Sequence, residues 1–416
     1  MKAPPASGPP DRKHTALAVW LLAAGQTIVW AGLFYSFAAL LLSWESDLGW
    51  NKTDIALGLT LALLVAAAMS PVAGRVVDAG NGRLLMSGGA LFGATALALL
   101  ATIESRTAFL ALWALIGLAH ASCLYDPCFA LITRTMGGSA RAAITRITLC
   151  AGFASTIAFP AGAWLASTVG WRGAVVVFAV GVACLGAPLL IAGSTLMLRR
   201  GETAHIVPRP AENRAAVKAA FGRRAFWLLA VAFPMLALNH GILLNHIIPI
   251  LVDRGLTEAM AVTVAALIGP SQVAGRLLMM RFDHRFSAIT LTVVAFAGHS
   301  IAAAVLFLAG ASLALAIAFA AMQGAAHGVI YILKPVVTAE SLGRTGFGAI
   351  SGLLAMPNLA GFAVAPFIGA ALGQYGGYGS AVLAAGGMAL VGLVLIAWLA
   401  STMRRSGGHL QVEGNR

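Results

Sequence analysis

The stretch RRGETAHIVPRPAENRAAVKAAFGRR, residues 199–224, is the only long polar segment between the ends of a chain of 416 residues. Its charges and prolines are typical of a linker. On either side the sequence is apolar, since hydrophobic residues make up 60% of the chain, charged residues 10%, and the mean hydropathy is +0.89. A water-soluble protein would have too little polar surface to cover such a core. The linker therefore separates two membrane-embedded halves.

Each half has room for six membrane crossings. A helix needs about 20 apolar residues to cross a hydrocarbon layer about 30 Å thick. The apolar runs predict about twelve helices, near residues 16–43, 55–77, 84–103, 107–133, 142–168, 173–197, 225–251, 259–280, 287–309, 312–337, 346–373 and 378–402. We expect an all-α integral membrane protein built as a disordered cytoplasmic tail (1–15), a six-helix bundle (16–197), a cytoplasmic linker (198–224), a second six-helix bundle (225–402) and a cytoplasmic tail (403–416).

The net charge of +13 lies in the predicted loops and tails. One side of the membrane receives Arg12, Lys13, Arg83, Arg134, Arg141, the basic residues of 199–224, Arg281, Arg285, Arg344, Arg404 and Arg405, and the other Lys52, Arg106, Arg172 and Arg254. Because Lys and Arg accumulate on the cytoplasmic side, this distribution predicts a multi-pass protein of the inner (plasma) membrane with both termini in the cytoplasm. The expected partner is the lipid bilayer, not nucleic acid.

Signatures of enzymes and metal sites do not stand out. The four cysteines all lie in predicted spans, with neither a disulfide framework nor a zinc-type spacing. The sequence contains no GxxxxGK[ST] phosphate loop and no HExxH, Ser-His pair or paired carboxylates at useful spacing. We expect no enzymatic activity, no cofactor and no resident metal.

The two halves carry short repeats in the same order. SPVAGR (70–75) returns as SQVAGR (271–276), GLAH (117–120) as GAAH (324–327), and RAAI (141–144) as FGAI (347–350). Asp126-Pro127 matches Lys334-Pro335 with a register shifted by one residue. Because the chain is rich in Ala and Gly, any single short match could arise by chance. The common order of the matches nevertheless indicates two related halves.

The segment GRVVDAGNGR (74–83) resembles a cytoplasmic motif of the major facilitator superfamily, Gly-x-x-x-Asp-x-x-Gly-Arg, between the second and third helices. Gly74, Asp78, Gly82 and Arg83 match it, and Gly80 is a spare glycine. The resemblance implies two six-helix halves with a substrate site between them near mid-membrane. Glycines allow close helix contact, and Asp78 is expected to accept hydrogen bonds from a helix N-terminus or an Arg, and so to act as a cytoplasmic gate.

A weaker similarity is to the monocarboxylate and oxalate-formate branch of that superfamily. It rests on the phrase formed by Asp47, Leu48, Gly49, Trp50 and Ile55. That branch holds its substrate carboxylate with an Arg in the eighth helix, where this sequence reads IGPSQ (268–272). The standard carboxylate mechanism of the branch therefore does not transfer directly.

Candidate functional residues are polar side chains inside predicted spans, because an ionisable group in the bilayer is costly unless it is paired or hydrated. The resemblance implies that helices one, four, seven and ten line the cavity. Those spans hold the residues that we assign to substrate binding or coupling: His120, Tyr125, Asp126, Asn239, His240, His246, Gln323, His327, Tyr331 and Lys334, with Asn245 nearby. Gln323, His327, Tyr331 and Lys334 follow spacings of four, four and three, which places them on one helix face.

Several roles stay open. Asp126 pairs with Arg146 as a structural ion pair, pairs with Lys334 across the halves as a gate, or stays protonatable without a fixed partner. The histidines suit proton coupling, metal or metal-chelate binding, or plain interhelical hydrogen bonds. Gln26, Trp30, Leu33 and Phe37 share a helix face and form either an aromatic cavity wall or core.

The function that we predict is secondary active transport of a small organic anion by a monomer, with the proton as coupling ion and without ATP. The anion assignment rests on Lys334, the only lysine in a predicted span, and on histidines that become cationic when protonated. The alternatives are efflux of amphipathic or cationic compounds, with Asp126 as anionic anchor and Trp30 and Phe37 stacking, and transport of a metal or metal chelate.

Overall fold

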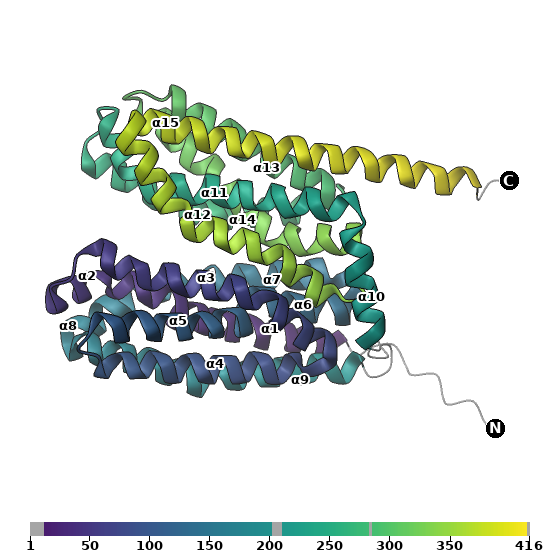
Figure 1. Ribbon diagram of the computed structural model, residues 1–416, viewed down its shortest axis with the longest axis horizontal. Helices are drawn as coiled ribbons and strands as arrows, with labels where there is room; N and C mark the ends of the chain where they lie inside the picture. Colours follow the sequence, from purple (N-terminus) through teal and green to yellow (C-terminus); the bar gives the residue numbers. More distant parts are fainter. Residues whose placement is uncertain (1–11, 202–209, 283–284, 414–416) are drawn as a thin grey trace. The chain divides into compact units, whose positions relative to one another are not determined.

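The computed structural model describes residues 12–201, 210–282 and 285–413, and these residues form helices joined by short turns, without a strand (Figure 1). Residues 1–11, 202–209, 283–284 and 414–416, which include parts of both predicted tails and of the linker, lie outside the described residues. The helices enter both predicted tails, because the first helix begins at Arg12 and the last one ends at Glu413. The prediction of an all-helical membrane protein is confirmed.

The described chain falls into two compact units. Unit 1 comprises residues 1–216 together with the short segment Thr345–Gly352, and unit 2 comprises residues 217–344 and 353–416. Their boundary after Ala216 lies inside α10 (Pro210–Phe221), within the polar stretch 199–224. The predicted domain boundaries themselves stay a prediction.

Unit 1 contains nine α-helices from the first part of the chain. They are α1 (Arg12–Val29), α2 (Ser36–Leu48), α3 (Lys52–Val76), α4 (Gly82–Leu99), α5 (Arg106–Cys123), α6 (Tyr125–Met136), α7 (Ala140–Ala151), α8 (Ala154–Gly181) and α9 (Ala187–Gly201). Three π-helical segments, Trp30–Tyr35, Val77–Asn81 and Val182–Gly186, continue or link these helices. π-turns inside helices are frequent at functional sites, and the first of these segments carries Trp30 and Leu33 of the predicted cavity wall.

Unit 2 is built from α11 (Arg224–Asp253), α12 (Glu258–Phe282), α13 (Ala288–Leu308), α14 (Leu313–Leu342) and α15 (Phe347–Glu413). Its core is a cluster of buried aliphatic side chains with Phe319 among them. The first turns of α15, up to Gly352, group with unit 1, and the rest of this helix groups with unit 2.

Among the described residues, eight helical stretches, some of them with short breaks, are apolar and long enough to cross a membrane, and the longest has 93 residues. A crossing takes about 20 residues, so the longest stretches hold more than one. Non-helical glycines lie inside them at Gly80, Gly170 and Gly377, close to borders between predicted spans. The count of twelve crossings stays a prediction.

Gly170 and Gly377 reveal a repeat that our sequence comparison missed. Both have the same backbone conformation, with φ 71° and ψ 168° at Gly170 and φ 70° and ψ 168° at Gly377. Each begins a similar phrase, GWRGAV (170–175) and GYGSAV (377–382). Their separation in sequence equals that of GLAH and GAAH, so the repeat extends further along both halves than the first matches indicate.

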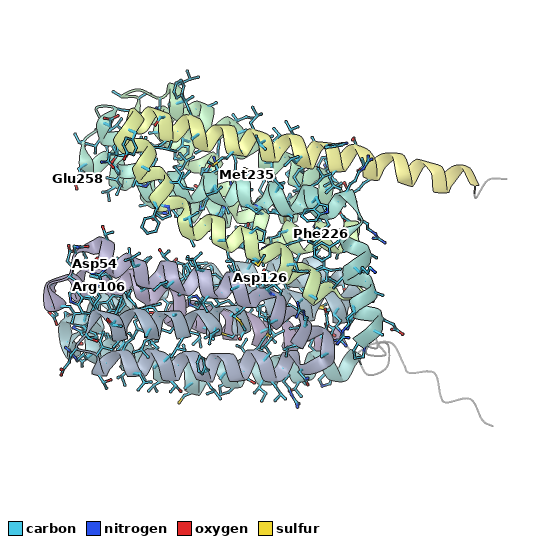
Figure 2. All side chains as sticks on the ribbon, viewed as in Figure 1. Asp54, Arg106, Asp126, Phe226, Met235 and Glu258 are labelled. Carbon is cyan, nitrogen blue, oxygen red and sulfur yellow. The ribbon has the colours of Figure 1, made fainter. Side chains whose placement is uncertain are left out.

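The surface of the helices is suited to lipid. Large apolar side chains are exposed on many helices, among them Leu84, Trp164, Leu185, Leu308 and Trp398. Many exposed apolar side chains on a helical protein are typical of a surface that contacts a membrane. Asp54 and Arg106 lie in the first turns of their helices and form an ion pair at 2.6 Å (Figure 2).

Candidate functional site

Asp78 of the glycine and aspartate motif lies against a helix N-terminus within unit 1. Asp78 is buried, and its two carboxylate oxygens accept hydrogen bonds from the backbone N–H groups of Gly348 and Ala349, each at 2.8 Å. These are free N–H groups of the first turn of α15, where the helix dipole also favours a negative charge. Asp78 therefore caps a helix N-terminus, as expected. Its role as a gate stays a prediction.

The glycines of this motif differ in their geometry. A side chain on Gly74 would overlap the backbone of Gly348, so the close contact expected there is present. The left-handed turn, however, falls on Gly80, with φ 88°, which we had regarded as spare, and not on Gly82. Gly82 begins α4 in ordinary helical geometry. Arg83 follows it and is half-buried.

Arg134 supports this motif from α6, which sequence reasoning missed. One of its guanidinium nitrogens donates to the backbone carbonyl oxygens of Val77 at 2.6 Å and Asp78 at 2.9 Å. These carbonyl groups lie where α3 gives way to the π-helical turn. A charge-assisted donor satisfies them at a point where regular helix hydrogen bonding is interrupted.

The fourth predicted span is broken in its middle. α5 ends at Cys123, Leu124 is extended with φ −79° and ψ −157°, and α6 starts at Tyr125. Inside a membrane, irregular backbone needs internal partners. Gln26 supplies them, because its side-chain amide donates to the carbonyl oxygen of Cys123 at 2.8 Å and approaches that of Leu124 at 3.4 Å.

The break presents three of the predicted site residues of unit 1. His120 is buried in the last turn of α5, and its Nε2 contacts the carbonyl oxygen of Leu33 at 2.9 Å. Asp126, which is half-buried, lies in the first turn of α6. Tyr125 packs on Trp30, with ring centroids 4.6 Å apart, and stacks on Phe129 at 4.9 Å.

The predicted aromatic wall divides into two groups. Trp30 lies with Phe34, Tyr35 and Tyr125 beside the break. Phe37 instead packs against Trp44 and Trp113 in a buried aromatic core. The π-helical turn at Trp30–Tyr35 widens the helix by about one residue per turn, so Phe37 leaves the face that regular 3.6-residue spacing predicts.

We expect Gln26→Leu to destabilise unit 1 without removing a charge. The leucine fills similar space but leaves the Cys123 carbonyl oxygen without a side-chain donor, at a cost of about 1–3 kcal/mol. Thermal unfolding of the purified protein in detergent should show a lower midpoint. Thr27→Val is the control, because the Thr27 hydroxyl bonds only within its own helix, to the carbonyl oxygen of Ala23. An unchanged midpoint for Gln26→Leu would contradict the role of this amide.

Unit 2 brings together four of the predicted residues. On α14, Gln323 donates from Nε2 to Asn239 Oδ1 at 3.0 Å and lies 3.4 Å from His240 Nδ1, both on α11. Asn239 in turn donates to the carbonyl oxygen of Ala385 at 2.9 Å. His327 stacks on His240 with ring centroids 3.3 Å apart and planes 8° from parallel. All four side chains are buried.

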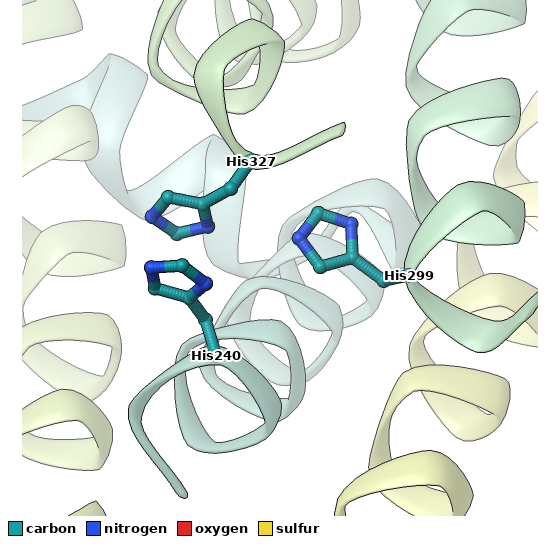
Figure 3. A group of neighbouring side chains, drawn as sticks. All are labelled: His240, His299 and His327. Atoms are coloured by element: carbon teal, nitrogen blue, oxygen red, sulfur yellow. The ribbon is translucent and has the colours of Figure 1, made fainter. Parts of the chain in front are cut away.

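A third histidine completes this group, and sequence reasoning missed it. His299 on α13 is fully buried, and its ring centroid lies 5.8 Å from that of His327 and 6.5 Å from that of His240. Figure 3 shows the three rings with nitrogen atoms turned toward one another. The signal was present in the sequence, since an ionisable residue within an apolar span is a candidate by default. His299 lies on the ninth predicted span, outside the four spans that the resemblance places around the cavity.

The other predicted residues of unit 2 lie outside this group or at its edge. His246 contacts the carbonyl oxygen of Pro366 through Nε2 at 2.9 Å, and Asn245 bonds to Gly241 in its own helix. Tyr331 packs edge-on to His327 at 5.2 Å, and both Tyr331 and Lys334, further along α14, are half-buried. Arg146 is exposed on α7. The pairing of Asp126 with Arg146 or Lys334 stays a prediction.

Apolar helices, a break within one of them that is closed by a side chain, and buried polar groups inside the bundles define a helical membrane transporter. The chain belongs to the Major Facilitator Superfamily, which its sequence matches over residues 19–320. It is accordingly a transporter and not an enzyme. No curated protein matches the sequence.

Solved structures of this superfamily share the fold. FucP in its outward conformation is 14% identical with a TM-score of 0.72, and the match covers 92% of this chain and 99% of that one. A variant of the E. coli fucose:proton symporter FucP is 16% identical with a TM-score of 0.69 over the same shares. The proton:xylose symporter XylE is 12% identical with a TM-score of 0.72, covering 92% of this chain and 95% of that one.

Proposed function

We propose that this transporter moves a small organic anion together with protons by alternating access. In this mechanism the two halves rock so that the binding site opens first to one side of the membrane and then to the other. The observation that carries the substrate class is the polar face of α14. Gln323, His327 and Tyr331 lie in contact with one another or with a shared partner, and Lys334 follows one turn later. A lysine within a long apolar helix places a positive charge where a neutral side chain would cost less free energy.

The names of two similar solved structures support proton coupling. FucP and XylE, which share the fold, are a fucose:proton and a proton:xylose symporter by name. In this chain, Asp126 and the histidines within the apolar spans are the side chains that we assign to proton coupling. Working without ATP, the protein would draw on the proton gradient.

We expect Lys334→Ala to abolish anion-driven proton uptake. Protein reconstituted in weakly buffered vesicles is exposed to organic anions, neutral sugars and amphipathic cations in turn, while a pH electrode records proton movement. The wild type should respond to an anion, and Lys334→Ala should reduce that response at least about tenfold, the effect of losing roughly 1.4 kcal/mol of binding. Lys218→Ala, in α10 outside the apolar spans, is the matched control. Equal anion responses in Lys334→Ala and the wild type would refute the anion assignment.

Efflux of amphipathic cations is the second candidate, favoured by the aromatic group at the break in unit 1. Trp30 packs on Tyr125, which directly precedes Asp126, and Phe34 and Tyr35 pack on Trp30. Aromatic faces and a carboxylate together attract organic cations. In the same assay, a response to cations that disappears in Asp126→Asn would favour this candidate.

A further inference from the structure

We propose that His240, His299 and His327 form a binding site for one divalent transition metal ion, of the zinc class, in the interior of unit 2. Three helices, α11, α13 and α14, each contribute one of these histidines. One ring nitrogen from each lies within 4.8 Å of the others (Figure 3). The site lies wholly within unit 2 and shares His327 with the face of α14 proposed for the substrate, but metal binding is measured without any substrate.

The hydrogen bonds of His299 determine which nitrogen faces the group. Its Nδ1 lies 2.8 Å from the carbonyl oxygen of Ala295. A carbonyl oxygen can only accept, so Nδ1 must carry the proton and Nε2 must carry the lone pair. That Nε2 is buried without a hydrogen-bond partner. A histidine held by a backbone carbonyl at one nitrogen, with the other left as an acceptor, is the usual arrangement of a metal ligand.

The other two histidines present matching nitrogens. Nδ1 of His327 is also buried without a hydrogen-bond partner. Nδ1 of His240 has only a 3.4 Å contact with the side-chain amide of Gln323, which is already bonded at 3.0 Å to Asn239. Unpartnered buried polar atoms cost about 1–3 kcal/mol each, and several in one place call for an explanation. A cation accepts all of these lone pairs at once.

The distances suit a metal after a small adjustment. With bonds of about 2.0–2.1 Å, the nitrogens of a tetrahedral zinc site lie about 3.4 Å apart. The separations here are 4.8 Å or less, so the longest has to close by at most about 1.4 Å. The parallel rings of His240 and His327 must also tilt, because each lone pair lies in the plane of its ring. Both changes call for rotation of these side chains.

The donor set selects the class of ion. Neutral imidazoles favour zinc, copper, nickel and cobalt, whereas magnesium and calcium prefer oxygen donors. Three protein ligands leave a fourth position, for water or for Gln323 Oε1, which is also buried without a hydrogen-bond partner. No carboxylate joins the group among the described residues. The charge of Arg276, which donates to the carbonyl oxygen of Gly328 beside His327, opposes a cation, so we expect moderate affinity.

Cobalt binding tests this site directly. Full-length protein in detergent, stripped with a chelator and passed through gel filtration, is titrated with Co²⁺ while visible absorption is recorded, and bound Zn²⁺ is counted in a parallel sample. We expect one ion per chain and the intense bands of four-coordinate cobalt. Mg²⁺ at equal concentration should not compete. A wild-type protein that binds no stoichiometric metal, or whose cobalt spectrum stays that of the hydrated ion, would overturn the proposal.

Variants locate the site. His299→Gln and His327→Gln should each weaken metal binding at least tenfold, whereas His246→Gln, a histidine of α11 turned away to Pro366, should bind metal as the wild type does. Each variant is first checked for a single gel-filtration peak. Metal binding that survives in both cluster variants, or that is lost equally in His246→Gln, contradicts the assignment. If a cluster variant fails to fold, the wild-type cobalt spectrum still decides.

Discussion

Replacing Asp78 by asparagine is expected to lower the thermal stability of the protein by several degrees. The carboxylate accepts two backbone N–H groups at 2.8 Å in a buried position. Asparagine has one oxygen, so one of these N–H groups would face an amide donor instead. Hydrogen bonds to charged groups contribute about 1.5–3 kcal/mol, and the favourable interaction of the charge with the helix N-terminus is lost as well.

The control for this experiment is Asp54→Asn. Asp54 also lies at a helix start, where its carboxylate accepts a hydrogen bond from the side-chain amide of Asn51 and pairs with Arg106, but this pair is partly exposed. Exposed ion pairs contribute about 0–1 kcal/mol, so we expect a small effect. Thermal unfolding in detergent measures both variants. Equal shifts for the two would mean that the bonds from Asp78 to Gly348 and Ala349 contribute no more than a surface contact.

A second large effect is expected for Gly117→Ala. Helices α3 and α5 pack so closely that a Cβ on Gly117 would lie 2.8 Å from the Cα of Ala62 and overlap its carbonyl oxygen. Backbone atoms cannot rotate aside, so the helices must separate. Overpacking of this kind costs about 1–3 kcal/mol or more. The repeat-related Gly324 of unit 2 meets the backbone of Ile268 in the same way, so Gly324→Ala should have a similar effect.

Gly88→Ala is the matched control for these variants. Gly88 lies in α4 with no atom within 4 Å of the position of an added Cβ. Alanine is a better helix former than glycine by about 1 kcal/mol, so this substitution should be neutral or stabilising. The sign of the change therefore differs between the close-contact glycines and the open one. A stabilising Gly117→Ala would show that α3 and α5 do not pack as described.

The sequence predicts the helical membrane fold well because the bilayer imposes a simple rule of length and polarity. It also predicts the contact of Asp78 with a helix N-terminus, since the motif specifies both the carboxylate and the glycines. The sequence does not say which glycine makes the turn, because Gly80 and Gly82 are equally able to adopt a positive φ and only the three-dimensional contacts choose between them.

The candidate site could be predicted only in part. Helical spacing places His327 and Tyr331 on one face, and the structure packs their rings together. His240 and His246 are six residues apart, which at about 100° per residue places them on different faces, so grouping them was unsafe. His299 could not be connected to His327 from spacing, because the contact depends on how α13 and α14 pack, and periodicity within one helix carries no information on that.

The eight residues Thr345–Gly352 have a consequence for any attempt to divide this protein into fragments. They follow the linker by more than a hundred positions, yet they belong to the first unit. A first-half fragment that stops in the linker would lack the amide groups that Asp78 binds, and would expose a buried carboxylate. Co-expression of both fragments should stabilise the first one, because the second fragment supplies residues 345–352. If the coding sequence is divided at the linker, we therefore expect both fragments to be needed together for a stable first unit.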